Sequence, residues 1–110
     1  MMRLDFGKII TERTYEYNGA KLTIRPYPRS RGKFASRDGS LLFSAADTLE
    51  AFKYCLASWD DVVDGDGKPI ALTDAVKEKL FESGLGGISD FVMQKNNEMI
   101  MEMAALEKNS

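Results

Sequence analysis

Few side chains in this chain have the chemistry that catalysis or metal binding requires. The 110 residues include no histidine and a single cysteine, Cys55. Histidine is the commonest general base and the commonest zinc ligand, so the chain lacks the residue that most often serves in either role. One cysteine can form neither an internal disulfide nor a thiolate metal cluster. Because Cys55 falls within an apolar helical pattern, we predict a buried and inert thiol.

The acidic turn Asp64-Gly65-Asp66-Gly67 has a spacing that suggests calcium. An EF-hand loop needs a ligand at its third position and a bidentate Glu at its twelfth. Counted from Asp60, these positions hold Val62 and Ala71, which have no such ligands. The sequence also lacks a glycine-rich phosphate cradle, and the adjacent carboxylates Asp60 and Asp61 would diverge. We therefore expect no catalytic residue, no metal, no cofactor and no enzymatic activity.

A basic stretch is the best candidate for an anionic partner. Between Glu16 and Asp38 there is no acidic residue, and residues 27–43 form a predicted loop rich in Pro, Gly and Ser. The candidate contact residues are the cations Arg25, Arg29, Arg31, Lys33 and Arg37. They would neutralise phosphates while the interleaved aromatic rings stack on bases. The alternative is a solvated loop, or one that docks on the acidic surface of a neighbouring molecule. Because the net charge is −2 and the pI is near 5.2, we do not expect nucleic acid as the partner.

The last predicted helix is the candidate surface for a protein partner. It begins near Ser89 and extends to about Leu106, and it ends in the run M-I-M-E-M-A-A-L, which is apolar over much of its circumference. Methionine suits surfaces that accept varied apolar partners. The candidate partner-binding residues are Met93, Met99, Ile100, Met103 and Leu106. The alternative is that these side chains pack in the core or in a homodimer helix, and a homo-oligomer is expected.

The elements that must position these residues indicate an α+β fold in a single domain, 1–110. An antiparallel β-hairpin at 9–26 is predicted to pack on about three helices in the part 44–107. The first helix is predicted after Ser44 and through Trp59, because apolar residues recur there at three- and four-residue spacing. A short second helix is predicted from Asp74 to Phe81, with Thr73 as its N-cap.

The hairpin is centred on Asn18-Gly19, the strongest short signal for a type I′ turn. Pairing outward from this turn sets Glu16 opposite Lys21, Thr14 opposite Thr23 and Glu12 opposite Arg25. The apolar residues of both strands then share the other face. Cross-strand agreement of this kind predicts both the hairpin and its register.

The sequence has neither the apolar core of a signal peptide near residue 1 nor a run of about 20 apolar residues that would span a membrane. We therefore expect a cytoplasmic protein that does not bind membranes.

The order of these features resembles the small tail assembly chaperones of long-tailed bacteriophages and prophages. A Tyr-rich hairpin ends in Thr23-Ile24-Arg25-Pro26, and a helix ending in Trp59 follows. The acidic stretch Val62–Pro69 and the pair Leu72-Thr73 then lead to the closing helices. This order is similar to the pattern W…V-D-x-D-G-x-P…T that joins two helices in that family. The resemblance covers most of residues 15–95.

The resemblance implies a role without catalysis. Members of this family coat the long hydrophobic tape-measure protein and keep it soluble until tail-tube subunits polymerise around it, so these proteins are the expected partners in the host-cell cytoplasm. The family also makes a longer second product by ribosomal slippage. The residues Glu107-Lys108-Asn109 can be encoded by GAA-AAA-AAC, which contains the slippery sequence A-AAA-AAC. The rival hypotheses are a small structural component of the virion, from the tail or connector, and a nucleic-acid-associated accessory protein.

Overall fold

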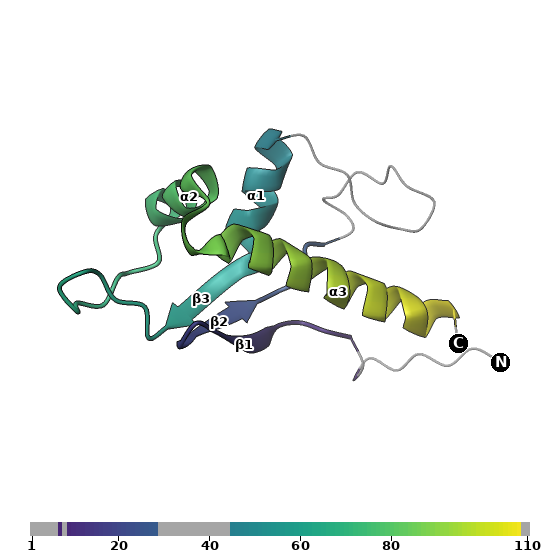
Figure 1. Cartoon of the computed structure of the whole chain (residues 1–110). Coiled ribbons are helices and arrows are strands. Elements are labelled where there is room, and N and C mark those ends of the chain that lie inside the picture. The colour runs from purple at the N-terminus through teal and green to yellow at the C-terminus, as the bar shows by residue number, and fades with distance from the viewer. Residues whose placement is uncertain (1–6, 8, 29–44, 109–110) are drawn as a thin grey trace.

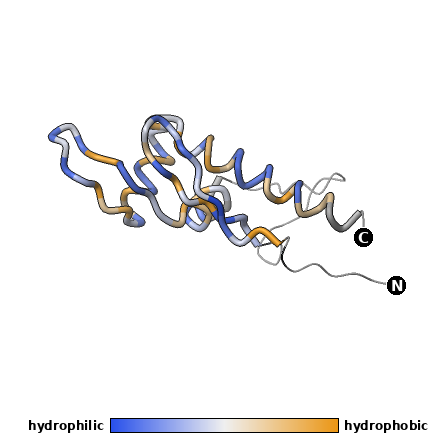
Figure 2. The backbone as a smooth tube through the Cα atoms, turned by 90° about the horizontal axis from the view of Figure 1, so that it is seen from below, coloured by the Kyte–Doolittle hydropathy of each residue, from blue (hydrophilic) through white to orange (hydrophobic). Residues whose placement is uncertain are grey.

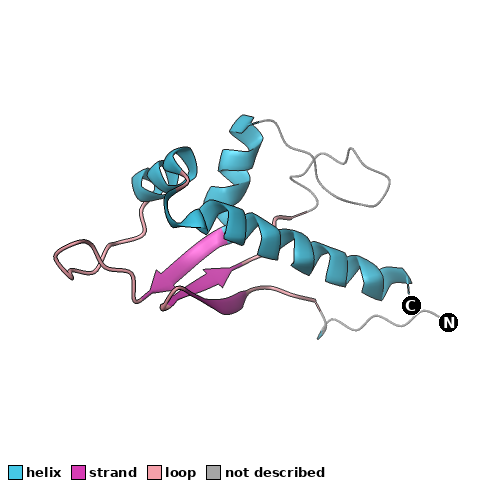
Figure 3. Ribbon diagram, viewed as in Figure 1, coloured by secondary structure: helices cyan, strands magenta, loops and turns pink. Residues whose placement is uncertain are grey.

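The computed structural model describes residues 7, 9–28 and 45–108, and it has the expected α+β architecture. Helices cover one face of a three-stranded antiparallel sheet of order β1-β2-β3 (Figures 1 and 3). In chain order the elements are β1 Arg13–Tyr17, β2 Ala20–Ile24, α1 Ala45–Cys55, β3 Leu56–Asp60, α2 Asp74–Ser83, the 3₁₀ turn η3 Leu85–Gly87 and α3 Ile88–Lys108. None of the described helices is long and apolar enough to cross a membrane.

The hairpin has the predicted register. Glu16 pairs with Lys21 and Thr14 with Thr23, and the two threonine hydroxyls are 2.9 Å apart. Asn18 and Gly19 have φ of 49° and 84°, as a type I′ turn requires. The predicted pair of Glu12 with Arg25 is not part of the ladder, because β1 begins at Arg13.

The prediction that the first helix continues through Trp59 is wrong. α1 ends at Cys55, and Leu56–Asp60 forms β3, which pairs antiparallel with β2. Thr23 lies opposite Ser58 whereas Ile24 lies opposite Leu56, so Ala57 is the extra residue of a β-bulge. The bulge brings Leu56 and Trp59 to the same face of the sheet. Their three-residue spacing therefore imitates the periodicity of a helix.

The direct junction between α1 and β3 leaves the last carbonyl groups of the helix in need of donors. Three of these carbonyl groups accept hydrogen bonds from donors elsewhere in the chain. The Lys53 carbonyl accepts from Lys77 Nζ at 2.6 Å, the Tyr54 carbonyl from Arg25 Nε at 2.6 Å, and the Cys55 carbonyl from the Arg25 amide at 2.9 Å. The cations also oppose the negative end of the helix dipole. Burial lowers the pKa of Lys77.

The turn between β3 and α2 is held by hydrogen bonds from its own residues. Trp59 Nε1 donates to the Ile70 carbonyl at 2.9 Å, so the indole anchors the far side of the turn. Asp64 Oδ1 accepts from the amides of Asp66 and Lys68, which places this carboxylate in the turn's own hydrogen bonding. Thr73 caps α2 by accepting from the Val76 amide at 3.2 Å, as predicted.

The core lies between the inner face of the sheet and the helices. α3 crosses this face diagonally (Figure 1), and its side chains Val92, Asn96 and Met99 are fully buried. Asn96 is a polar residue in an apolar stripe. Its Oδ1 accepts from the Tyr27 amide at 2.8 Å, which fixes the chain after β2, and its Nδ2 has no hydrogen-bond partner among the described residues. The outer face of the sheet is polar, with the rows Thr14–Thr23–Ser58 and Glu16–Lys21–Asp60.

Candidate protein-binding surface

The structure divides the predicted partner-binding residues of α3 between core and surface. Met99 is 0% exposed and Ile100 is 9% exposed, so both belong to the hydrophobic core rather than to an exposed face. Met93 and Met103 are half-buried. Leu106 lies in α3, but its side chain is outside the described part of the structure. Met99 and Ile100 belong to the same buried cluster as Leu22, Ile24 and Val92.

Only one of the predicted anion-binding cations can be placed. The Arg25 Nε donates a hydrogen bond to the Tyr54 carbonyl at the C-terminus of α1, and the guanidinium lies 3.8 Å from the centre of the Tyr54 ring. Its side chain therefore has a structural role. Arg29, Arg31, Lys33 and Arg37 fall outside the described residues.

Large apolar side chains are nevertheless exposed where α3 ends. The C-terminal half of α3 lies beside residues 9–13, which precede and begin β1 (Figure 1), and we call this part of the molecule the α3 end. Met101 is 62% exposed and Ile9 is 52% exposed there. Figure 2 shows the apolar start of the described N-terminal segment near the last turns of the helix. Neither residue is among the predicted partner-binding residues, although Met101 belongs to the run M-I-M-E-M of this helix.

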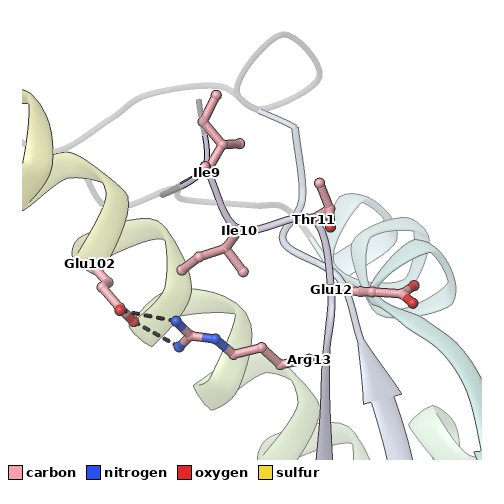
Figure 4. Close-up of a pocket in the computed structure, with 7 residues that line it drawn as sticks. Ile9, Ile10, Thr11, Glu12, Arg13 and Glu102 are labelled. Carbon is pink, nitrogen blue, oxygen red and sulfur yellow. Dashed lines mark hydrogen bonds and ion pairs between the residues drawn. The ribbon is translucent and has the colours of Figure 1, made fainter. Parts of the chain in front are cut away.

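A hollow of about 360 Å³ opens at the α3 end, between the N-terminal segment and the helix (Figure 4). Its lining residues are Gly7, Ile9, Ile10, Thr11, Glu12, Arg13 and Glu102. The Arg13 guanidinium donates to both carboxylate oxygens of Glu102, at 2.8 and 3.0 Å. This hydrogen bonding holds the pKa of Glu102 below its ordinary value. The pair ties β1 to α3 and gives the hollow a charged wall beside the apolar Ile9.

The described residues offer no site for metal chemistry. No three His, Cys, Asp or Glu side chains among them gather closely enough to hold a metal ion. The acidic turn, whose spacing suggested calcium, uses Asp64 for its own amides.

No protein-family model, curated protein or solved structure matches this chain.

Cys55 is expected to be unreactive in the folded protein. Its thiol is fully buried, and burial raises the pKa of Cys55 to about 12. At pH 8 the thiolate fraction is then about 10⁻⁴, and the thiolate is the species that attacks disulfide reagents. We expect Ellman's reagent at pH 8 to label Cys55 only after unfolding in guanidinium. Complete labelling of the native protein within minutes would contradict the buried position.

Proposed function

We propose that this protein is a non-enzymatic tail assembly chaperone, which binds the tape-measure protein of a phage or prophage in the host-cell cytoplasm and keeps it soluble. The observation that carries this proposal is the exposure of Ile9 and Met101 at the α3 end, beside an open hollow. A long hydrophobic helical client needs a partner with apolar side chains that tolerate varied sequences, and methionine and isoleucine supply them. The resemblance of residues 15–95 to the chaperone family supports the same role.

The polar groups of the hollow fit such a client as well. Arg13 and Glu102 present both signs of charge, and their side chains are 43% and 52% exposed. An amphipathic helix has charged residues at the border of its apolar face. It can place its apolar face on Ile9 and its border charges near the ion pair, while Met101 lies outside the lining of the hollow, about 100° round α3 from Glu102. Tail-tube subunits are possible further partners, since they replace the chaperone on the tape-measure protein.

Co-expression with the tape-measure protein encoded in the same phage or prophage genome tests this proposal. The wild-type chain is expected to move that protein from the insoluble to the soluble fraction. The double variant Ile9→Glu, Met101→Glu should lower the soluble yield roughly ten-fold, because both charges fall on the proposed apolar contact. Both side chains are more than half exposed, so the fold should remain intact.

The chain offers a matched control. Val63 is 53% exposed and Leu85 is 68% exposed, and both lie away from the α3 end. The variant Val63→Glu, Leu85→Glu adds the same charge to a surface of similar exposure and should keep full solubilising activity. Equal losses in the two double variants would show that the α3 end is not the contact surface. Rings or fibres formed without the tape-measure protein would instead favour a structural component of the virion.

A further inference from the structure

The outer edge of β1 has backbone groups that no described strand satisfies. The sheet order places β1 at one edge, where β2 is its only partner among the described strands. Tyr17 and Ala20 flank the two-residue turn and so exchange hydrogen bonds, and in an antiparallel ladder every second residue does the same. Tyr15 and Arg13 therefore direct their amide and carbonyl groups toward β2. The amide and carbonyl groups of Thr14 and Glu16 point away from β2, toward the outer edge of the sheet.

The two edges of the sheet differ in how well they are protected against pairing. β3, at the opposite edge, has the bulge at Ala57, and Asp61 directly after it has φ of 62°. Bulges and irregular backbone of this kind keep other strands away. β1 has the sequence R-T-Y-E-Y, with no bulge, Pro, Gly or Lys. Within the described part of the chain, β1 is therefore the sheet edge that remains open to another strand.

The open edge is also held rigid. The ring of Tyr17 stacks on Phe91 of α3 with centroids 4.4 Å apart, and Arg13 is tied to Glu102 at the other end of the strand. A partner strand would meet an edge that is already ordered, which reduces the entropy cost of association.

We propose that β1 pairs antiparallel with β1 of a second copy of this chain, about a two-fold axis at Tyr15. Each copy contributes its three strands to one continuous sheet. In this register Thr14 exchanges hydrogen bonds with Glu16 of the second copy, and Tyr15 lies opposite its counterpart. This symmetric arrangement is the isologous interface of common homodimers.

Charge selects this register. Because only outward-facing residues can pair, the axis must pass through a residue of the strand. An axis at Thr14 sets Glu12 of one copy opposite Glu16 of the other. An axis at Glu16 sets the two copies of Glu16 opposite each other, and an axis at Arg13 sets the two copies of Arg13 opposite each other. Like charges directly opposite each other are unfavourable. The axis at Tyr15 avoids all of them.

The flank of α3 beside β1 is compatible with a second copy. It presents Lys95 and Glu98, which are paired at 3.0 Å, and Glu102, which is paired with Arg13. The ammonium of Lys95 also lies 5.4 Å from the centre of the Tyr15 ring. Two such flanks brought together carry both signs of charge. Tyr15 and Tyr17 are only half-buried in one copy, so pairing would cover the exposed parts of their rings.

Amide hydrogen exchange followed by NMR, together with sedimentation equilibrium, tests the proposal on the unmodified protein. At concentrations where the mass is that of two copies, the amides of Thr14 and Glu16 should be protected. On dilution to one copy they should exchange freely, whereas the amides of Tyr15 and Tyr17 stay protected in both states. A single copy at every accessible concentration would overturn the proposal, and so would a dimer in which Thr14 and Glu16 exchange freely.

Two variants of Thr14 separate edge pairing from side-chain effects. Thr14→Pro removes the outward amide without removing a bond to β2, and symmetry doubles the loss across the interface. It should weaken the dimer roughly ten-fold or more. Thr14→Val is the matched control, because it also loses the hydroxyl contact with Thr23 but keeps the amide, and it should dimerise like the wild type. A dimer that Thr14→Pro does not weaken would overturn the proposal.

Cross-linking gives an answer even where Thr14→Pro disturbs the hairpin. Opposed non-hydrogen-bonded residues have Cα atoms about 4.5 Å apart, within the range of a disulfide. Tyr15→Cys should therefore form a disulfide-linked dimer on mild oxidation, while Cys55 stays buried. Ser58→Cys places an exposed thiol on β3 and should link much more slowly. Equal rates of disulfide formation for the two variants would overturn the proposed pairing. If β1 instead paired with a strand of a different protein, the amides of Thr14 and Glu16 would be protected from exchange only when that protein was present, which would also overturn it.

Discussion

Met99→Glu is expected to unfold most of the protein at pH 7. The Met99 side chain is 0% exposed and lies in the same buried cluster as Phe52, Leu56 and Val92. A carboxylate at this position would be taken out of water without a cation to pair with, and the packing of the methionine would be lost as well. Together these changes should lower the free energy of unfolding by at least about 4 kcal/mol. That is a large part of the stability of a small domain. Urea denaturation followed by circular dichroism measures the change.

Met101→Glu is the control on the same helix. Its side chain is 62% exposed, so the same charge should change the free energy of unfolding by less than about 0.5 kcal/mol. If Met99→Glu left the stability equally unchanged, Met99 would have to be on the surface, and the α3 stripe would belong to a partner interface after all. The two variants thus decide between core and surface, the two alternatives that the methionine-rich run of the sequence leaves open.

Asn96→Asp is expected to make the stability depend strongly on pH. Asn96 is fully buried, and its Nδ2 has no partner in the described part of the chain, so a protonated Asp fits the same site without losing a hydrogen bond. The ionised form is disfavoured by burial, which raises the pKa of the variant carboxyl above its unfolded value of about 3.9. The folded variant is therefore comparable to the wild type below about pH 4 and loses stability as the pH rises. The loss should reach about 3 to 4 kcal/mol at pH 7.

Asn97→Asp is the matched control for this effect, because Asn97 is the next residue and is exposed. Both variants replace an amide with a carboxyl group on neighbouring residues, so the general effect of acid on the fold cancels when their unfolding free energies are compared at each pH. The difference between them should vanish near pH 4 and grow toward pH 7. A difference that did not depend on pH would mean that the carboxylate introduced by Asn96→Asp is hydrated or paired with a cation.

These properties give α3 two roles along its length. Its stripe from Val92 to Ile100 belongs to the core, and it contains one polar residue that fixes the chain after β2. Its last turns lie beside residues 9–13 and expose Met101. The proposed partner-binding surface therefore lies at the end of the helix and does not extend along the whole methionine-rich run.

The features that were predicted correctly depend on neighbours in the sequence. Asn18-Gly19 favours positive φ by itself, and the pairs that follow it fix the register of the hairpin. Thr73 caps α2 with a bond that spans three residues. The α+β class follows from these local signals. The wrong prediction concerned Leu56–Asp60, because a bulge at Ala57 gives a strand the apolar spacing of a helix.

The sequence by itself determined the hairpin and its register, the cap of α2 and the lack of histidine chemistry, because each depends on composition or on residues a few positions apart. Only the tertiary structure decided that Leu56–Asp60 is a strand, since its hydrogen bonds are made to β2, more than thirty residues earlier. It also decided that Arg25 caps α1 and that Met99 is buried while Met101 is exposed. Local pattern cannot decide such cases, because a helix that is apolar nearly all round does not specify which side meets the sheet.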